Sequence, residues 1–214
     1  MKIEKFTFKD REEACSDLCK VLPIDTMLQE NWVVLAVSLG GVSIAKHISK
    51  TLQSSFDYIF THKIFASNND ECEIAIVTET SEVVIHEELM KSFKLNLKDI
   101  YCNADEIYNT KIQEYKKKYR DSRSLVSLKD ANVLIVDEGL NTGLTMMACI
   151  KSVVTQGAKS ICVAVPVLPK VIVNDIETIA DDLYYVKAID HFVSIDFYYE
   201  KLEDISFEDI KEYN

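Results

Sequence analysis

Residues 131–145 constrain the fold of this chain more than any other segment. Four apolar residues in a row, from Val133 to Val136, are typical of a strand that is buried on both faces of a parallel sheet. Asp137 and Glu138 follow directly, and a helical pattern begins at Met146. Because ligands of such sheets collect at the carboxyl ends of the strands, this order predicts a binding site beside the two acids.

The loop between the acids and the helix suits an anion. Gly139 and Gly143 permit tight turns that bring backbone N–H groups close to a ligand. Thr142 and Thr145 add hydroxyl donors, and the N-terminus of the following helix favours negative charge. Acids that can hydrogen-bond a diol, beside a cradle for phosphate, indicate a site for a ribose 5-phosphate. The alternative is an ordinary strand–turn–helix with incidental acids.

The segment from Val133 to Thr145 resembles the 5-phosphoribosyl-1-pyrophosphate (PRPP) binding motif of the type I phosphoribosyltransferases, in residue type and in order. The resemblance implies that Asp137 and Glu138 hold the ribose hydroxyls, act as catalytic residues and help to bind Mg²⁺, mainly through water. It also implies a 5-phosphate site formed by the loop residues Gly139, Leu140, Asn141, Thr142, Gly143, Leu144 and Thr145.

A second loop is expected to bind pyrophosphate. Residues 8–14, 34–42, 157–159 and 163–167 match segments of a bacterial branch of the family, in which a Gly-Gly loop follows the first core strand. The resemblance implies that this loop binds pyrophosphate through Ser38, Leu39, Gly40 and Gly41.

Two features of this loop carry further expectations. An Arg is usual in the branch where Leu39 stands, so binding is left to amides, Mg²⁺ and other cations. Lys63 is expected to supply one such charge, with a solvated surface lysine as the alternative. We expect the backbone of residues 38–40 to be strained or cis, or to change conformation when ligand binds.

The resemblance further implies a flap at about residues 63–82 and a C-terminal hood at about residues 187–214. The polar loop 65–71 lies where relatives carry a mobile flap, but it lacks their usual Gly and Pro. Residues 192–197 resemble the base-holding segment of purine salvage members in shortened form, which implies base binding by Phe192 and Val193. An aromatic tail that covers the sheet edge is the alternative.

Asn141 bears on the acceptor. Many 6-oxopurine enzymes of the family carry an Asp at this place in the motif, near N7 of the base. Asn141 can donate a hydrogen bond but cannot take a proton at neutral pH. Either another group handles the proton, or the acceptor is not a 6-oxopurine.

The rest of the chain alternates between strand and helix patterns. Strands are expected at residues 32–37, 57–64, 133–136, 161–165 and 183–186, with one or two more at 74–85, and helices at 10–22, 41–52, 97–120, 143–156 and about 170–180. This alternation predicts an α/β fold with a doubly wound, mainly parallel sheet flanked by helices. We expect one phosphoribosyltransferase domain, residues 1–214, with the small flap and hood as appendages.

Composition bounds the class of protein. The formal net charge of −11 argues against binding to nucleic acid or to an anionic membrane. No stretch approaches a membrane span in length, and we expect a cytoplasmic protein whose six cysteines are reduced. Cys15 and Cys19 could share a helical face, but no second ligand pair lies near them in the sequence. His62, His86 and His191 also lack the spacing of metal ligands.

The resemblance therefore implies an Mg²⁺-dependent phosphoribosyltransferase. It would transfer the 5-phosphoribosyl group of PRPP to a small nitrogenous acceptor, first of all a nucleobase, and release pyrophosphate; a homodimer is the assembly considered. The alternative is a PRPP- or nucleotide-sensing regulator on the same fold, with which Leu39, Asn141 and the unusual flap are compatible. A hydrolase or phosphorylase that uses the same pocket is a weaker third hypothesis.

Overall fold

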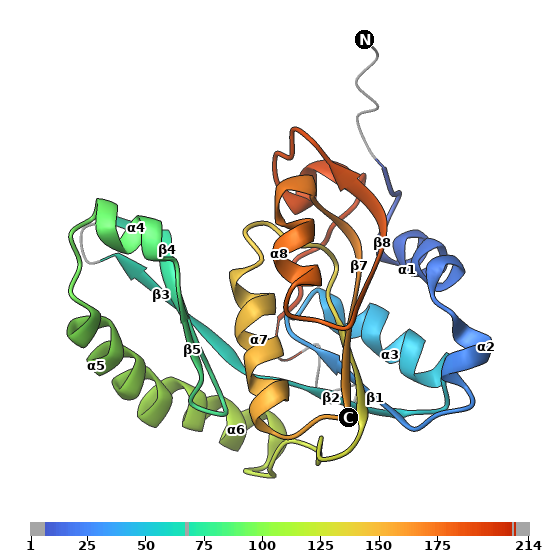
Figure 1. The fold of residues 1–214 in the computed structure, drawn as a ribbon, viewed down its shortest axis with the longest axis horizontal. Coiled ribbons are helices and arrows are strands. Elements are labelled where there is room, and N and C mark those ends of the chain that lie inside the picture. Colours follow the sequence, from blue (N-terminus) through green and yellow to red (C-terminus); the bar gives the residue numbers. More distant parts are fainter. Residues whose placement is uncertain (1–6, 67–68, 207, 209–214) are drawn as a thin grey trace.

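The structure, a computed structural model, describes residues 7–66, 69–206 and 208. A sheet of five parallel strands, in the order β2-β1-β6-β7-β8, forms its centre (Figure 1). The strands are β1 (Trp32–Ala36), β2 (Ser55–Tyr58), β6 (Asn132–Val136), β7 (Ser160–Pro169) and β8 (Asp182–Ile189). This arrangement confirms the expected parallel sheet.

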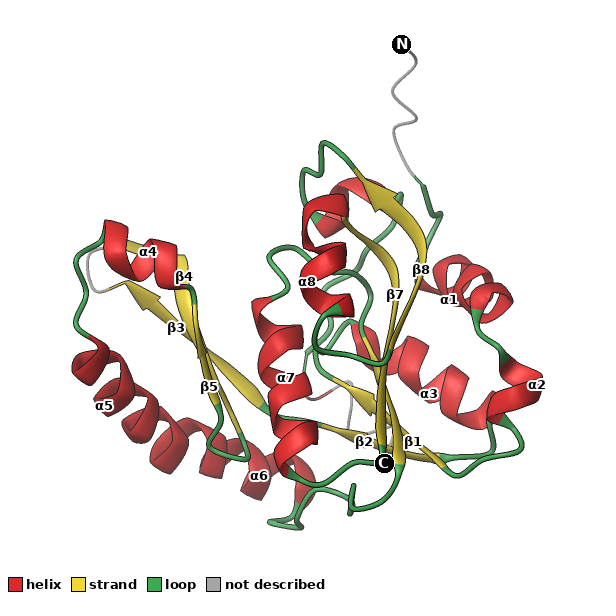
Figure 2. Cartoon of the chain, in the orientation of Figure 1, coloured by secondary structure: helices red, strands yellow, loops and turns green. Residues whose placement is uncertain are grey.

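Helices cover both faces of the central sheet (Figure 2). On one face lie α1 (Arg11–Val21) and α3 (Gly41–Thr51), and on the other lie α7 (Leu144–Thr155) and α8 (Val173–Glu177). Successive side chains of a strand point to opposite faces. Val34 accordingly packs with the α1 and α3 side chains, whereas Val33 and Leu35 pack with those of α7 and α8. The continuous apolar runs are therefore explained by a sheet that is covered twice.

A second, antiparallel sheet stands beside the first, at the left of Figure 1. It contains β3 (Thr61–Ala66), β4 (Asn69–Thr78) and β5 (Val83–Ile85), followed by α4 (Glu87–Ser92), α5 (Leu97–Ile107), a π-helical turn (Tyr108–Ile112) and α6 (Gln113–Arg120). Ile100 and Ala104 of α5 pack on Ile64 and Val77 of this sheet. We call residues 61–120 the side lobe. The expected long helix 97–120 is confirmed as one helical run with a π turn.

The structure differs from two expectations about the strands in this part of the chain. A single strand at residues 57–64 is wrong, because β2 pairs with β1 in the central sheet and β3 pairs with β4 in the other. Between them, the N–H of Ile59 still donates to Ala36, whereas that of Phe60 donates to the Glu79 carboxylate. The expected polar loop 65–71 is largely strand on either side of residues 67 and 68, which lie outside the described residues.

Arg120 joins the end of the side lobe to the central sheet. Its guanidinium Nη2 lies 2.5 Å from Oε1 of Glu79 and 2.8 Å from the carbonyl oxygen of Tyr58, and the group lies over the Phe60 ring at 4.5 Å. The side chains of Arg120 and Glu79 are only 5% and 3% exposed. Because neither side chain is accessible to water, this buried ion pair holds the end of the side lobe in place against the central sheet.

The remaining helical pieces are short: α2 (Ile24–Met27) and the 3₁₀ turns Lys170–Ile172 and Ile195–Tyr198. Across the described ranges, every helix is too short or too polar to cross a bilayer.

Candidate active site

The candidate site lies where the central sheet changes direction of winding. β1 is hydrogen-bonded on one side to β2 and on the other to β6, with Ala36 opposite Val136. The carboxyl ends of β1 and β6 therefore lie side by side, which is the switch point at which open α/β sheets bind ligands. A pocket of about 730 Å³ opens there. Its lining includes Ser38, Leu39, Lys63 and every residue from Asp137 to Thr145, so the two predicted loops and the predicted lysine converge.

Asp137 directly follows β6 and is only 7% exposed. One of its oxygens, Oδ1, accepts a hydrogen bond from the Ser38 hydroxyl and another, at 2.8 Å, from the N–H of Glu138. Burial raises the pKa of Asp137 to about 7, and the charge of Glu138 adds to the rise. The two hydrogen bonds and the positive charge of Lys63 oppose it without cancelling it. Asp137 is thus a carboxyl group whose charge is costly in its buried position.

Glu138 forms an ion pair with Arg11, which is distant from it in the sequence. Nε of Arg11, in the first turn of α1, lies 2.5 Å from Oε2 of Glu138, and both side chains are about 15% exposed. The carboxylate lies directly over Gly40, where an added Cβ would collide with it. The hydroxyl of Tyr199 donates to the carbonyl oxygen of Glu138 at 2.7 Å. Arg11 is absent from the predicted site, although its segment carries part of the resemblance.

Residues 139–145, the predicted phosphate loop, present backbone donors to the pocket. Gly143 adopts the left-handed conformation (φ 76°) immediately before α7, and the side chains of Leu140 and Leu144 are buried in the core. Among the described residues, nothing accepts from the N–H groups of Asn141, Thr142, Gly143 and Thr145. The N–H of Leu140 instead donates to Val167 at 3.0 Å, so this amide does not face an anion.

Residues 38–41, the predicted pyrophosphate loop, form an ordinary trans turn. The hydroxyl of Ser38 accepts from the N–H of Gly41 at 3.0 Å, and the N–H of Val42 donates to the Leu39 carbonyl at 3.2 Å. Gly40 has φ −63° and ψ −33°, and the described residues contain no cis peptide bond. The expected strained or cis backbone is therefore wrong, whereas a change of conformation when ligand binds stays a prediction. The Ser38 hydroxyl, by bonding to both Gly41 and Asp137, holds the turn without strain.

Lys63 lies in the pocket wall on β3. Its ammonium group is 2.8 Å from Oε2 of Glu73 on β4, and its side chain is 56% exposed. Because its charge lowers the pKa of Asp137, Lys63 lies within electrostatic reach of the acids. An anion between them could draw Lys63 away from Glu73 at little cost, since an exposed ion pair is weak.

The C-terminal segment reaches the pocket through Ile195. Phe192 packs on Tyr198 with ring centroids 5.0 Å apart, and Val193 is largely exposed. Neither lines the pocket, so their predicted role in base binding does not fit this conformation. Ile195 lines it instead, and its N–H donates to Oδ1 of Asn141 at 3.2 Å. Residues 207 and 209–214 of the predicted hood lie outside the described residues.

The opposite wall supplies groups that sequence reasoning missed. Tyr58, His62 and Tyr115 line the pocket, and His62 Nδ1 lies 3.0 Å from the Tyr115 hydroxyl. Burial lowers the pKa of His62, which favours the neutral imidazole. Burial and the nearby Asp137 raise the pKa of Tyr58. Tyr115 lies 53 positions from His62, on α6, so no local pattern in the sequence links the two residues.

Comparison with known proteins gives a consistent result. The phosphoribosyl transferase domain family matches residues 24–200. A provisionally named phosphoribosyl transferase of Mycobacterium tuberculosis, Rv0571c, is 25% identical over 176 residues, which are 82% of this chain and 39% of that protein. The chain therefore spans about two fifths of this relative's length.

Solved structures share the fold. The crystal structure of TT1426 from Thermus thermophilus superposes with a TM-score of 0.77 at 23% identity, and covers 97% of each chain. A hypoxanthine phosphoribosyltransferase from Staphylococcus aureus superposes with a TM-score of 0.48 at 14% identity, over 87% of this chain and 77% of that chain. The second similarity is too low to bear on the acceptor.

Proposed function

Because this chain belongs to the phosphoribosyl transferase domain family, we propose that its pocket binds PRPP and transfers the 5-phosphoribosyl group to a nitrogen acceptor. One observation carries the proposal. Two adjacent carboxyl groups, Asp137 and Glu138, line the pocket together with the loop 139–145. In this loop, four backbone N–H groups have no acceptor among the described residues: those of Asn141, Thr142, Gly143 and Thr145. Carboxylates suit ribose hydroxyls, and convergent N–H groups suit a phosphate.

The phosphate loop would hold the 5-phosphate. The N–H groups of Asn141, Thr142, Gly143 and Thr145 would donate to it, together with the Thr142 and Thr145 hydroxyls. The N-terminus of α7 adds favourable electrostatics. Leu140 and Leu144 would contribute through backbone position alone, because their side chains are buried. With the phosphate fixed here, the ribose would extend toward Asp137 and Glu138.

The two acids would act on the sugar as pyrophosphate leaves. Loss of pyrophosphate from C1 leaves oxocarbenium-like positive charge on the ribose ring. Asp137 and Glu138 would accept hydrogen bonds from the ribose hydroxyls and stabilise that charge from a buried position, where electrostatic interactions are strong. Ser38 would keep Asp137 oriented through the hydrogen bond that its hydroxyl donates to Oδ1.

Mg²⁺ is part of this proposal. The carboxylate oxygens of Asp137 and Glu138 are ligands of the type Mg²⁺ prefers, and they line the same pocket as Lys63. They would hold the ion mainly through water and substrate oxygens, and the ion would supply charge neutralisation on the pyrophosphate. On the protein side, Lys63 and the N–H groups of Leu39 and Gly40 would bind the same leaving group, because the Gly41 N–H already donates to the Ser38 hydroxyl.

The acceptor is proposed to be a small nitrogenous base. Asn141, whose amide oxygen accepts from Ile195, offers no basic group for a proton. The neutral imidazole of His62, in the same pocket, is a group that could take one. A cytoplasmic location also remains part of the proposal.

The test is a panel of purine, pyrimidine and pyridine bases incubated with PRPP and Mg²⁺, with pyrophosphate release followed over time. We expect release with at least one base from the wild-type protein and from an Asp99→Asn control, which removes an exposed acid of the side lobe. We expect none from Asp137→Asn. Tight PRPP binding without pyrophosphate release in the presence of any base would contradict the transfer reaction and favour a ligand-sensing role.

A further inference from the structure

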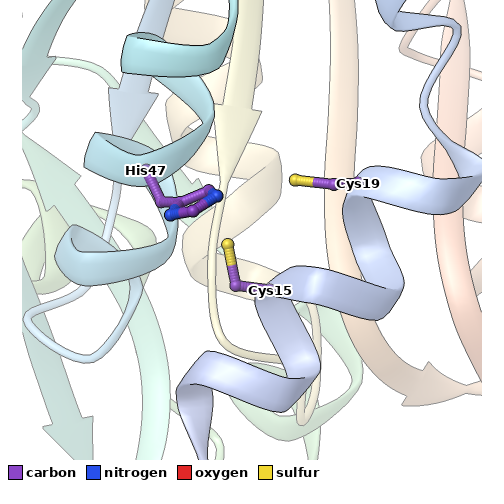
Figure 3. A group of neighbouring side chains, drawn as sticks. All are labelled: Cys15, Cys19 and His47. Carbon is purple, nitrogen blue, oxygen red and sulfur yellow. The ribbon is translucent and has the colours of Figure 1, made fainter.

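A cluster of metal-binding side chains lies outside the candidate active site. Cys15 and Cys19, one turn apart on α1, face His47 on α3 (Figure 3). One ligand atom of each residue lies within 4.8 Å of the others. The two cysteines gave no metal signal in the sequence because the third member lies on another helix, 28 positions beyond Cys19.

We propose that Cys15, Cys19 and His47 bind a thiophilic divalent metal ion, with Zn²⁺ the best match. Thiolate and imidazole are the ligands that select zinc over the hard ions Mg²⁺ and Ca²⁺. All three side chains come from the helices that cover one face of the central sheet, so the site would join α1 to α3.

The spacing requires a small adjustment. Zn–S bonds of about 2.3 Å and Zn–N bonds of about 2.0 Å place tetrahedral ligand atoms roughly 3.4–3.8 Å apart. The observed limit of 4.8 Å therefore calls for closure of about 1.4 Å at most. Cys15 is buried and its Sγ already lies 3.9 Å from the carbonyl oxygen of Ile44, whereas His47 is exposed and can rotate. The closure would thus come from His47.

The surroundings supply free thiols and an open fourth position. None of the six cysteines takes part in a disulfide bond. Cys15 and His47 also line a pocket of about 480 Å³ together with Glu12 and Ser43. The Ser43 hydroxyl oxygen is buried and has no hydrogen-bond partner among the described residues. A water or a carboxylate completing the coordination sphere would give that hydroxyl a partner.

The test uses the reduced full-length protein with Co²⁺ and Zn²⁺ as probes. Co²⁺ should bind with one-to-one stoichiometry and produce a thiolate charge-transfer band and the visible bands of tetrahedral cobalt. Zn²⁺ should displace it and raise the midpoint of thermal unfolding, because an ion that binds only the folded state stabilises it. Cys19→Ser and His47→Gln should each weaken Zn²⁺ binding at least tenfold.

Cys102→Ser and His191→Gln serve as matched controls, since both residues are exposed and lie outside the cluster. They should leave the cobalt spectrum and the zinc affinity unchanged. The proposal is overturned if the reduced protein shows no charge-transfer band, or if Cys19→Ser and His47→Gln bind Zn²⁺ as the wild type does. Exposed or half-buried positions were chosen for substitution so that folding is preserved, which circular dichroism checks.

Discussion

The buried position of Asp137 lowers the stability of the fold whenever its carboxyl group is charged. Its pKa is raised from about 3.9 in an unfolded chain to about 7 by burial. Between these values the folded state holds more protons than the unfolded state, so stability falls as pH rises. The cost is absent below about pH 4, where the group is protonated in both states, and is complete above about pH 7. Stability is given up here for a carboxylate at the proposed ribose site.

Asp137→Asn should therefore stabilise the fold while it abolishes function. The amide oxygen can still accept from Ser38 and from the Glu138 N–H, but it carries no charge to bury. At pH 8 the free energy of unfolding should rise by roughly 1–4 kcal/mol, since one pKa unit corresponds to about 1.4 kcal/mol. At pH 4 the gain should vanish. Urea denaturation at both pH values, with Asp99→Asn as control, measures it; an equal gain at both would contradict this account.

Gly40 and Gly41 should respond differently to alanine. A Cβ on Gly40 would meet the Glu138 carboxylate, the mobile end of a side chain, whereas one on Gly41 would come within 2.9 Å of the Asp137 backbone. Gly41→Ala should cost roughly 1–3 kcal/mol of stability, and Gly40→Ala should cost less. Gly40→Ala should lower pyrophosphate affinity mainly by displacing Glu138.

A double-mutant cycle separates these effects. In a Glu138→Ala background the clash at Gly40 is gone, so Gly40→Ala should cost almost no stability there. The cost of Gly41→Ala should persist in the same background. Identical costs for Gly40→Ala with and without Glu138 would show that the carboxylate does not lie over Gly40 in solution.

At the scale of elements, Arg120 is the anchor of the side lobe. It pairs with Glu79, bonds to the Tyr58 carbonyl and lies over Phe60. Arg120→Met should lower the free energy of unfolding by about 3–5 kcal/mol, because it leaves the Glu79 carboxylate buried without a positively charged partner. Lys118→Met, which breaks an exposed pair with Glu208 near the same helix end, should change it little. Urea unfolding compares the two, and equal losses would remove Arg120 from this role.

Local pattern predicted most elements, and the small flap that the resemblance implied is confirmed as the antiparallel sheet of the side lobe. Buried strands such as the one at Val133–Val136 could be predicted from their apolar runs, because a strand that is covered on both faces needs apolar residues on both. The segment around Ile59 and Phe60 could not, since its division between two sheets depends on Glu79 and Arg120, which are distant in sequence. The same limitation hid Arg11, His62 and Tyr115 from the predicted site.

At the scale of the whole molecule, the order of the strands determines where the proposed binding pocket lies. β1 and β6 become neighbours only in the folded sheet, and each is followed by a loop that the sequence had marked as anion-binding. The C-terminal segment was predicted less well. Its aromatics pack on one another, and Ile195 rather than Phe192 reaches the pocket. Which of several apolar residues in an irregular segment faces a site depends on packing that no periodicity records.

The central claim, that the pocket between β1 and β6 is the PRPP site, is tested most directly by calorimetric titration with PRPP in the presence of Mg²⁺. The wild-type protein should bind one PRPP per chain, and the Asp137→Asn, Glu138→Gln double variant should show at least a tenfold loss of affinity while it still unfolds cooperatively. Wild-type affinity in that variant would contradict the account.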